Sequence, residues 1–277
     1  MDGLFESLVE RSKHAIPAQQ GDYEMDGLIH CGKCHTPKQT VIEFNGKKFK
    51  PFCLCKCEAD RQKAEEEEAR RIEREKEIAR MRRTAFSERM MESWTFANDD
   101  LSNEKITNAM RRYAEKFSEM RERGKGLLLY GTVGTGKTYA ACEVANALID
   151  RGIPCLVTNF ARLANTIQGL YEDKQEYIDS LSHYALLVID DLGAERKSEF
   201  MQEMVFNIID ARYRSGLPMI ITTNLTIEQI KSPENVNYSR IYDRIIERCF
   251  PIEVNGKSRR RAAVRADYND MKSLLGL

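Results

Sequence analysis

Apolar residues gather into short runs in the C-terminal two thirds of this 277-residue chain. Between residues 93 and 277 these runs alternate with stretches of helical periodicity, which predicts an α/β fold with a mainly parallel sheet. Several runs are apolar throughout, as expected of strands that are covered on both faces. The predicted strands are residues 126–130, 154–159, 185–190, 218–223 and 250–254.

Residues 58–92 follow a different pattern, dominated by Glu, Arg and Lys and free of Gly and Pro. The pattern predicts a helix, supported by oppositely charged pairs at i,i+4 spacing, Glu66–Arg70 and Glu67–Arg71. Apolar residues are too sparse to fill both core positions of a coiled-coil repeat. We therefore predict a solvated linker helix between a module at residues 1–57 and a domain at residues 93–277.

Composition adds an expectation about the compartment. Hydrophobic residues make up 42% of the chain and charged residues 31%, which is typical of a soluble globular protein. The formal net charge is zero, so any surface that attracts nucleic acid must be local. The first nine residues include Asp2 and Glu6, and no run of 18 apolar residues occurs. These features predict no secretory signal, no membrane span and a cytoplasmic location.

Five of the eight cysteines lie between residues 31 and 57. Asn45-Gly46 stands between two segments of alternating character, which predicts a hairpin inside this cluster. A C-x-x-C pair, a hairpin and a second cysteine group are typical of a zinc-ribbon-like structural site with four thiolates. The expected Zn²⁺ ligands are Cys31, Cys34 and Cys53, while Cys55 and Cys57 compete for the fourth position.

A phosphate-binding pattern follows the apolar run 127–130. It reads Gly131-Thr-Val-Gly-Thr-Gly-Lys137-Thr138 and precedes a helical stretch, so the G-x-x-x-x-G-K-T motif stands in its strand–loop–helix context. The glycines let backbone N–H groups surround phosphates, Lys137 supplies a cation to the β- and γ-phosphates, and the Thr138 hydroxyl is a Mg²⁺ ligand. The predicted ATP-binding residues are Gly131, Thr132, Val133, Gly134, Thr135, Gly136, Lys137, Thr138 and Tyr139.

Two acidic residues end a later apolar run, 186–189. A buried strand of this kind delivers its last side chains to the edge of the sheet where ligands bind. We expect Asp190 to reach Mg²⁺ through water and Asp191 to orient or deprotonate the water that attacks ATP. Asn224, after the strand 218–223, either helps to place that water or is a simple strand-end turn residue.

Together these motifs resemble the ATPase domain of DnaC/DnaI-type replicative helicase loaders, to which IstB-type transposition helper ATPases are related. The resemblance rests on the P-loop, the Leu-Leu-Val-Ile-Asp-Asp strand, Thr222-Thr-Asn224 and Ser239–Arg244, with Ser93–Phe96 as the lead-in segment. It covers roughly residues 86–265. It implies an AAA+ fold with a five-stranded parallel sheet and self-association that places ATP between neighbouring subunits.

The resemblance also implies two arginine roles. Arg244 matches the arginine finger that acts on the ATP of the next subunit, and Arg260 matches the arginine that senses the γ-phosphate in cis. Arg240, Arg244 and Arg248 share one helical face, which alternatively is a solvated basic stripe. Few residues follow Arg260, which implies a truncated lid. Asp191 departs from the Glu of many AAA+ ATPases and leaves the water geometry open.

The implied function is ATP-dependent loading of a replicative DNA helicase onto single-stranded DNA, with a cysteine module that contacts the helicase as in DnaI-like loaders. The alternatives are an IstB-like helper of a transposase and an adaptor that binds ATP without hydrolysing it. DNA contacts are expected in the basic stretch 257–265 or at Lys197–Phe200. The second segment reads equally well as a helix start capped by Ser198.

Overall fold

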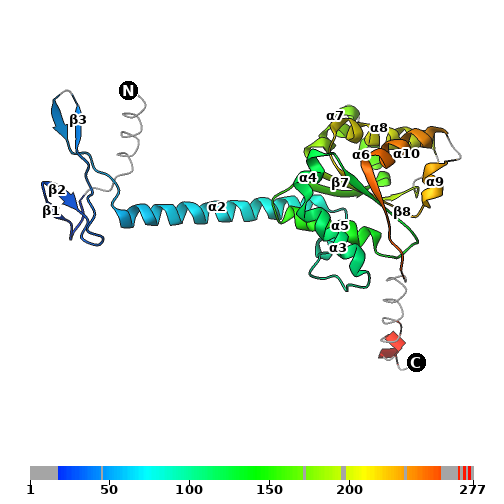
Figure 1. Cartoon of the computed structure of the whole chain (residues 1–277), viewed down its shortest axis with the longest axis horizontal. Coiled ribbons are helices and arrows are strands. Elements are labelled where there is room, and N and C mark those ends of the chain that lie inside the picture. The colour runs from blue at the N-terminus through cyan, green and yellow to red at the C-terminus, as the bar shows by residue number, and fades with distance from the viewer. Residues whose placement is uncertain are drawn as a thin grey trace. The chain divides into compact units, whose positions relative to one another are not determined.

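The computed structural model describes residues 18–44, 46–170, 173–194, 198–233, 236–256, 268, 271–272 and 274–275 of the chain. The chain divides into two compact units, the N-terminal unit Met1–Glu75 and the C-terminal unit Lys76–Leu277. The division falls inside one helix, α2 (Lys56–Ala85), so that helix contributes residues to both units (Figure 1).

The N-terminal unit contains two short antiparallel hairpins. Strand β1 (Tyr23–Met25) pairs with β2 (Leu28–His30), and β3 (Ile42–Phe44) pairs with β4 (Lys47–Phe49). The second hairpin confirms the one that the sequence predicts around Gly46. The first was not predicted, although its turn residues Asp26 and Gly27 have φ values of 55° and 73°, the positive values that a tight hairpin turn requires.

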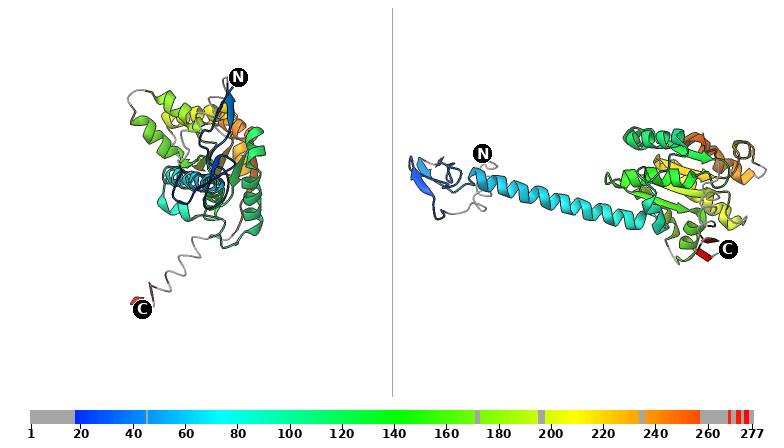
Figure 2. Two further views of the ribbon diagram at one scale, coloured as in Figure 1. Left: turned by 90° about the vertical axis from the view of Figure 1, so that its left-hand side faces the viewer. Right: turned by 90° about the horizontal axis from the view of Figure 1, so that it is seen from below.

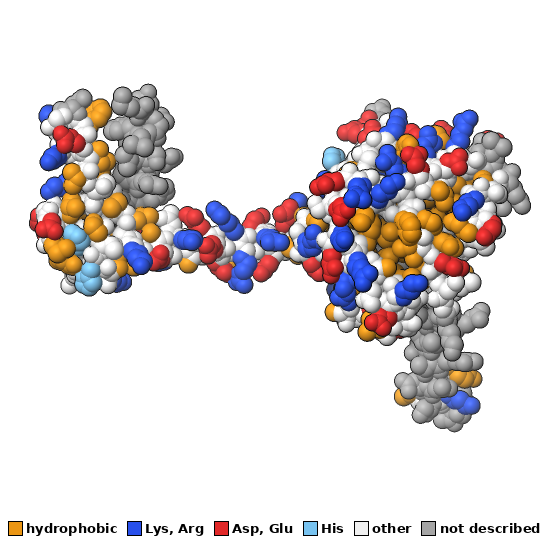
Figure 3. Space-filling view, viewed as in Figure 1, with side chains coloured by type: hydrophobic (Ala, Val, Ile, Leu, Met, Phe, Trp, Pro, Cys, Tyr) orange, Lys and Arg blue, Asp and Glu red, His pale blue; other side chains and the backbone are white. Residues whose placement is uncertain are grey.

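The charged helix is confirmed as α2, with side chains of both signs along it (Figure 3). Its ion pairs differ from the predicted ones, since Glu67 pairs with Lys63 and Arg71 pairs with Glu68. The helix also ends before residue 92. Ala85 is fully buried in the core of the C-terminal unit and Phe86 forms a β-bridge with Val157, so the backbone leaves the helix to join the sheet. A 3₁₀ helix, η1 (Arg89–Ser93), follows.

The C-terminal unit is built on a five-stranded sheet in which every neighbouring pair is parallel. Its order is β6-β7-β8-β5-β9. The strands begin within one residue of the predicted positions, which confirms the α/β fold. They are β5 (Gly126–Tyr130), β6 (Cys155–Asn159), β7 (Leu186–Leu192), β8 (Met219–Thr223) and β9 (Cys249–Glu253).

Helices cover both faces of this sheet (Figure 2). Alternate strand residues enter two separate cores: Leu127 and Leu129 pack with α3 and α5, whereas Leu128 packs with α6, α8 and α10. The helices are α3 (Glu104–Glu115), α4 (Phe117–Glu122), α5 (Lys137–Ile149), α6 (Phe160–Gln168), α7 (Lys174–Ser180), η2 (Leu181–His183), α8 (Glu199–Ser215), α9 (Ile227–Lys231) and α10 (Val236–Arg248).

Two sequence expectations fall partly beyond this description. Arg260 and the whole basic stretch 257–265 lie outside the described residues, as does most of the segment expected to form the truncated lid. In the described part of the chain, no helix combines the length and the apolar composition that crossing a bilayer requires.

Candidate nucleotide site and metal centre

The predicted phosphate loop connects the end of β5 to the start of α5. Three of its glycines have positive φ, with values of 139° at Gly131, 83° at Gly134 and 94° at Gly136. A Cβ on Gly131 would lie 2.6 Å from the carbonyl oxygen of Val254, so only glycine lets the loop turn at this point. The loop therefore has the backbone geometry that turns N–H groups toward an anion at a helix N-terminus.

The side chain of Lys137, the first residue of α5, is buried beside this loop. Its Nζ donates to the carbonyl oxygens of Gly131 (2.9 Å) and Thr132 (2.8 Å) and to Oδ1 of Asn224 (2.8 Å). Asn224 follows β8, which lies between β7 and β5 in the sheet. The ammonium group is thus fixed at the carboxyl edge of the sheet by contacts from two different loops.

The two predicted carboxylates end β7 at the same edge. Asp190 accepts a hydrogen bond from Thr222 Oγ1 at 2.5 Å and another from Thr138. Burial raises the pKa of Asp190, while those two hydrogen bonds oppose the rise. Asp191 is exposed, has a φ of 56°, and accepts from Asn224 Nδ2 at 3.4 Å. The contact between Thr138 and Asp190 joins the two oxygen groups predicted to hold Mg²⁺, and hydroxyl and carboxylate oxygens suit that ion.

A cavity of about 180 Å³ lies between these groups. Its wall includes an aromatic pair, of which the sequence prediction named Tyr139 but not Trp94: the two rings are stacked with centroids 5.5 Å apart. Such a flat surface beside a phosphate loop suits a nucleobase. The signal was present in the lead-in segment, where Trp94 is the single tryptophan of the chain. The cavity is lined by Trp94, Val133, Gly134, Gly136, Lys137, Thr138, Tyr139, Asp191 and Asn224.

Arg244, on α10, lies away from this cavity and contacts α8 of the same unit. Its guanidinium donates to Asp210 Oδ1 at 2.7 Å and lies 4.6 Å from the ring centroid of Phe206. Arg248 stacks similarly on Tyr213. The predicted basic stripe is therefore mostly packed against α8, with Arg240 as its exposed member.

The candidate DNA segment at 197–200 is described only in part. Lys197 lies outside the described residues. Ser198 caps α8, since its hydroxyl accepts from the backbone N–H of Met201 at 3.2 Å. The alternative interpretation, a helix start capped by Ser198, is therefore confirmed, and Phe200 beside it is 36% exposed.

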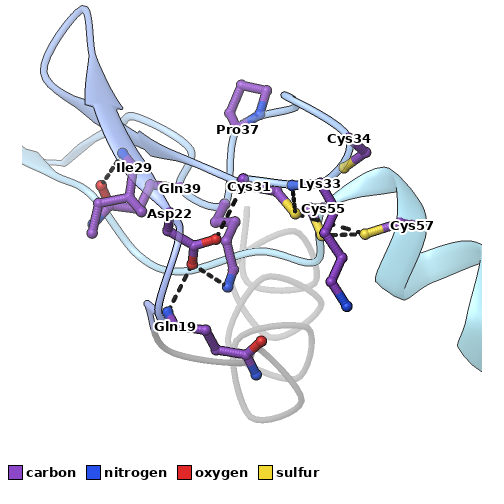
Figure 4. A network of polar contacts seen from close by, with 12 residues as sticks. Gln19, Asp22, Ile29, Cys31, Lys33, Cys34, Pro37, Gln39, Cys55 and Cys57 are labelled. Atoms are coloured by element: carbon purple, nitrogen blue, oxygen red, sulfur yellow. Dashed lines mark hydrogen bonds and ion pairs between the residues drawn. The ribbon is translucent and has the colours of Figure 1, made fainter.

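Four cysteines of the N-terminal unit form a compact cluster (Figure 4). The Sγ atoms of Cys31, Cys34, Cys55 and Cys57 all lie within 4.8 Å of one another, with Cys31–Cys57 at 3.7 Å and Cys55–Cys57 at 3.4 Å. Four thiolates around Zn²⁺, each about 2.3 Å from the ion, stand about 3.8 Å apart at the corners of a tetrahedron. The four residues present therefore fit a structural zinc ion.

Cys53, which the sequence prediction placed among the ligands, lies outside this cluster. Its backbone N–H donates to the carbonyl oxygen of Lys38 at 2.7 Å, and its Sγ points toward the carbonyl oxygen of Pro37 at 3.8 Å. Cys55 and Cys57 do not compete for one position: Cys55 immediately precedes α2, Cys57 lies in the first turn of α2, and both thiols join the cluster.

A buried ion pair supports the cysteine cluster. Lys38 Nζ lies 2.6 Å from Asp22 Oδ2, and both side chains are almost fully buried. Asp22 also accepts from the backbone N–H groups of Gln19 (2.8 Å) and Gly32 (3.1 Å), and the contact with Lys38 is the main cause that lowers its pKa to about 2. A hydrogen bond with Thr36 lowers the pKa of Cys34 to about 5, whereas hydrogen bonds with the neighbouring thiols, that of Cys55 first, raise the pKa of Cys57 to about 12.

Comparison with known proteins identifies a family of ATP-binding proteins that matches the part of the chain with the nucleotide site. The family model described as IstB-like ATP binding protein matches residues 59–266. The replicative helicase loader DnaI of Bacillus subtilis (strain 168) is 22% identical over 210 residues, which cover 69% of this chain and 66% of that protein. The replicative helicase loader DnaC of Escherichia coli (strain K12) is 25% identical over 166 residues, covering 57% of this chain and 68% of that protein.

Among solved structures, a crystal structure of DnaI superimposes with a TM-score of 0.54 at 29% identity. The superposition covers 65% of this chain and 99% of that one. The sequence matches extend over about two thirds of the length of the two curated relatives.

Proposed function

The chain belongs to the family of IstB-like ATP binding proteins, and from this premise we propose that it hydrolyses ATP in order to load a replicative DNA helicase onto single-stranded DNA. Its fold is the AAA+ type that the motifs predicted. The relatives named DnaI and DnaC are replicative helicase loaders, which supports the partner assignment. We also assign the protein to the cytoplasm, where a replicative helicase acts.

One observation carries the ATPase proposal: a cation, two carboxylates and an amide converge beside the phosphate loop. Lys137 contacts Asn224, Asn224 contacts Asp191, and Asp190 contacts Thr138. These groups meet at the edge of the sheet where α/β proteins bind ligands. When Mg²⁺ is bound, it neutralises phosphate charge next to Thr138 and Asp190.

The proposed reaction divides the work among these residues. Lys137 holds the β- and γ-phosphates, and Asn224 orients the attacking water toward Asp191. Asp191 accepts a proton from that water as the water oxygen bonds to the γ-phosphorus. The bond between the γ-phosphorus and the bridging oxygen breaks, and ADP leaves with that oxygen. A general base of this kind contributes about 10²–10⁴-fold in rate.

Self-association completes the proposed site. Arg244 lies outside the cavity of its own chain. Its guanidinium is held by contacts with Asp210 and Phe206, and its side chain is 27% exposed. An arginine presented from one subunit suits the ATP of the next, because its charge is permanent and its donors are forked. Arg260 is proposed to sense the γ-phosphate in cis.

In this proposal the N-terminal module and the C-terminal ATPase domain have separate roles. Residues 1–57, with zinc at the four cysteines, form the surface that binds the helicase. Residues 58–92 link it to the ATPase domain at 93–277.

A helper of a transposase is the second candidate function, favoured by the description of the family itself. The cysteine cluster favours the loader, because transposase helpers generally lack such a module.

A loading assay tests the proposal. The purified chain, the replicative helicase encoded in the same genome and circular single-stranded DNA are mixed with ATP, and helicase bound to the circles is measured after gel filtration. We expect ATP-dependent transfer, which Lys137→Ala abolishes. Wild-type protein that leaves helicase loading unchanged but activates a transposase would replace the first candidate by the second. Undiminished loading by Asp191→Asn would indicate an adaptor that binds ATP without needing hydrolysis.

A further inference from the structure

The pairing between β7 and β8 breaks its register at the two predicted carboxylates. Ile189 lies opposite Ile221, and the next pair in register is Leu192 with Thr223. Two residues of β7, Asp190 and Asp191, therefore stand opposite the single residue Thr222, which is the arrangement of a β-bulge. A regular strand would turn consecutive side chains to opposite faces. The bulge is what allows two adjacent acids to serve one site.

Thr222 fills this bulge with its hydroxyl group. Thr222 Oγ1 donates to Asp190 Oδ1 at 2.5 Å and accepts from the backbone N–H of Asp191 at 2.9 Å. The Thr222 hydroxyl thus donates its proton to the side chain of Asp190 and accepts a hydrogen bond from the backbone of Asp191 through a lone pair. The residue is fully buried, so water does not replace either contact.

The conformation of Asp191 needs such support. Its φ of 56° lies in the left-handed region, which is unfavourable for residues with a side chain and persists where surrounding contacts hold it. The neighbouring Thr223 does not supply that support, because its hydroxyl donates to the carbonyl oxygen of Leu192. Asn224 reaches only the side chain of Asp191, at 3.4 Å.

We propose that Thr222 is a positioning residue that fixes the separate roles of Asp190 and Asp191. This inference rests on the proposed ATPase function and deepens it. Through its proton, Thr222 turns the Asp190 carboxylate toward the Mg²⁺ position beside Thr138. Through its lone pair, it anchors the backbone of Asp191 so that the carboxylate faces Asn224 and the attacking water.

Three variants separate this role from simple core packing. Thr222→Val keeps the shape and removes both contacts, Thr222→Ser keeps the hydroxyl and removes a methyl group, and Thr158→Val alters a buried threonine of β6 in the same sheet. We expect Thr222→Val to lower kcat by about 100-fold, the cost of misplacing a reacting group by about 1 Å. We expect Thr222→Ser to restore most of the turnover and Thr158→Val to keep it.

Binding measurements show whether the effect reaches the acids. A fluorescent ATP analogue is titrated first without Mg²⁺ and then with increasing Mg²⁺. We expect Thr222→Val to leave the affinity for the ATP analogue in the absence of Mg²⁺ unchanged. It should raise the Mg²⁺ concentration at which half of the Mg²⁺-dependent change in fluorescence is reached. Turnover equal to wild type, or a loss that serine does not rescue, would overturn the assignment. Wild-type protein without ATPase activity would instead refute the proposed function, and the Mg²⁺ titration would still report on Thr222.

Discussion

In the C-terminal unit, two clusters of buried apolar side chains flank the sheet, and fully buried residues such as Phe117 and Leu128 lie on opposite sides of it. In the N-terminal unit, the buried apolar residues within the described chain are two cysteines, Cys31 and Cys55. Its hairpins leave large side chains such as Phe44 and Phe49 half exposed. Burial of apolar surface therefore stabilises the C-terminal unit, whereas we propose that the N-terminal unit depends on a metal held by its cysteines and on a polar network.

Removing two of the proposed metal ligands should have the largest effect, and it should be confined to the N-terminal unit. Cys31→Ser combined with Cys34→Ser removes two of four thiolates, and structural zinc contributes on the order of 10–16 kcal/mol of apparent folding free energy. We expect the N-terminal unit to unfold and helicase binding to be lost, while the C-terminal unit keeps its thermal transition and its ATP affinity. Metal analysis and circular dichroism measure both outcomes.

Cys53→Ser is the matched control for that variant. Cys53 lies outside the cluster, so this protein should retain about one zinc ion per chain, as the wild type should. Loss of zinc from Cys53→Ser would contradict the ligand assignment. A zinc-free chain that still captured the helicase would show that the C-terminal unit is the docking surface.

Arg244→Ala tests whether the C-terminal unit can fail in function without failing in structure. A trans-acting arginine is worth roughly 10³–10⁵ in the rate of related phosphoryl transfers. We expect hydrolysis by the assembled protein to fall in that range while nucleotide affinity and zinc content stay unchanged. The exposed Arg240→Ala is the control and should hydrolyse ATP normally. Mixing Arg244→Ala with Lys137→Ala should restore part of the activity, and no restoration at any ratio would argue against a shared site.

Asp191→Asn tests one carboxylate within the same unit. The amide keeps the size of the side chain but cannot accept the proton of the attacking water, so hydrolysis should fall by about 10²–10⁴-fold. Nucleotide affinity should remain, because Lys137 and the phosphate loop are unaltered. Steady-state phosphate release and equilibrium nucleotide binding separate the two quantities. Hydrolysis at the wild-type rate would remove Asp191 from the mechanism.

Lys38→Gln should produce the smallest of these effects, and it should be confined to the N-terminal unit. The variant leaves the buried carboxylate of Asp22 without its cation and removes positive charge from beside the thiolates. Losing such an outer contact typically weakens metal affinity by about 10–100-fold. Competition with a chromophoric chelator measures the change. Lys33→Gln alters the same charge at an exposed position and should bind zinc like the wild type.

Strands and phosphate loop were predictable because their signals are continuous. Each sheet strand is a run of apolar residues, and a buried parallel strand leaves little freedom to begin elsewhere. The bulge at Asp191 was not predictable, because it depends on register against β8 and on the hydroxyl of Thr222. No single strand carries that information.

The cysteine cluster shows a different limit. Spacing identified Cys31 and Cys34, but it did not show that Cys55 and Cys57 both join them while Cys53 stays outside, because the start of α2 decides which thiols converge. Lys38 and Asp22 were missed for a similar reason. They lie 16 residues apart in the sequence and meet only in the folded N-terminal unit. The hairpin at residues 23–30 could have been found from Asp26-Gly27, whose turn chemistry is explicit in the sequence.

The contacts of Lys137 have a consequence for calorimetry. Its ammonium group has three hydrogens and donates to three oxygens of the protein, so a phosphate oxygen gains a hydrogen bond only by displacing one of them. Asn224 is the partner most easily displaced, because the other two are backbone carbonyls of the loop. Lys137 therefore contributes to the heat of ATP binding only the difference between a new ionic contact and an old amide contact. If Lys137 has the role that we propose, its enthalpic contribution to binding should be modest even though its replacement abolishes turnover.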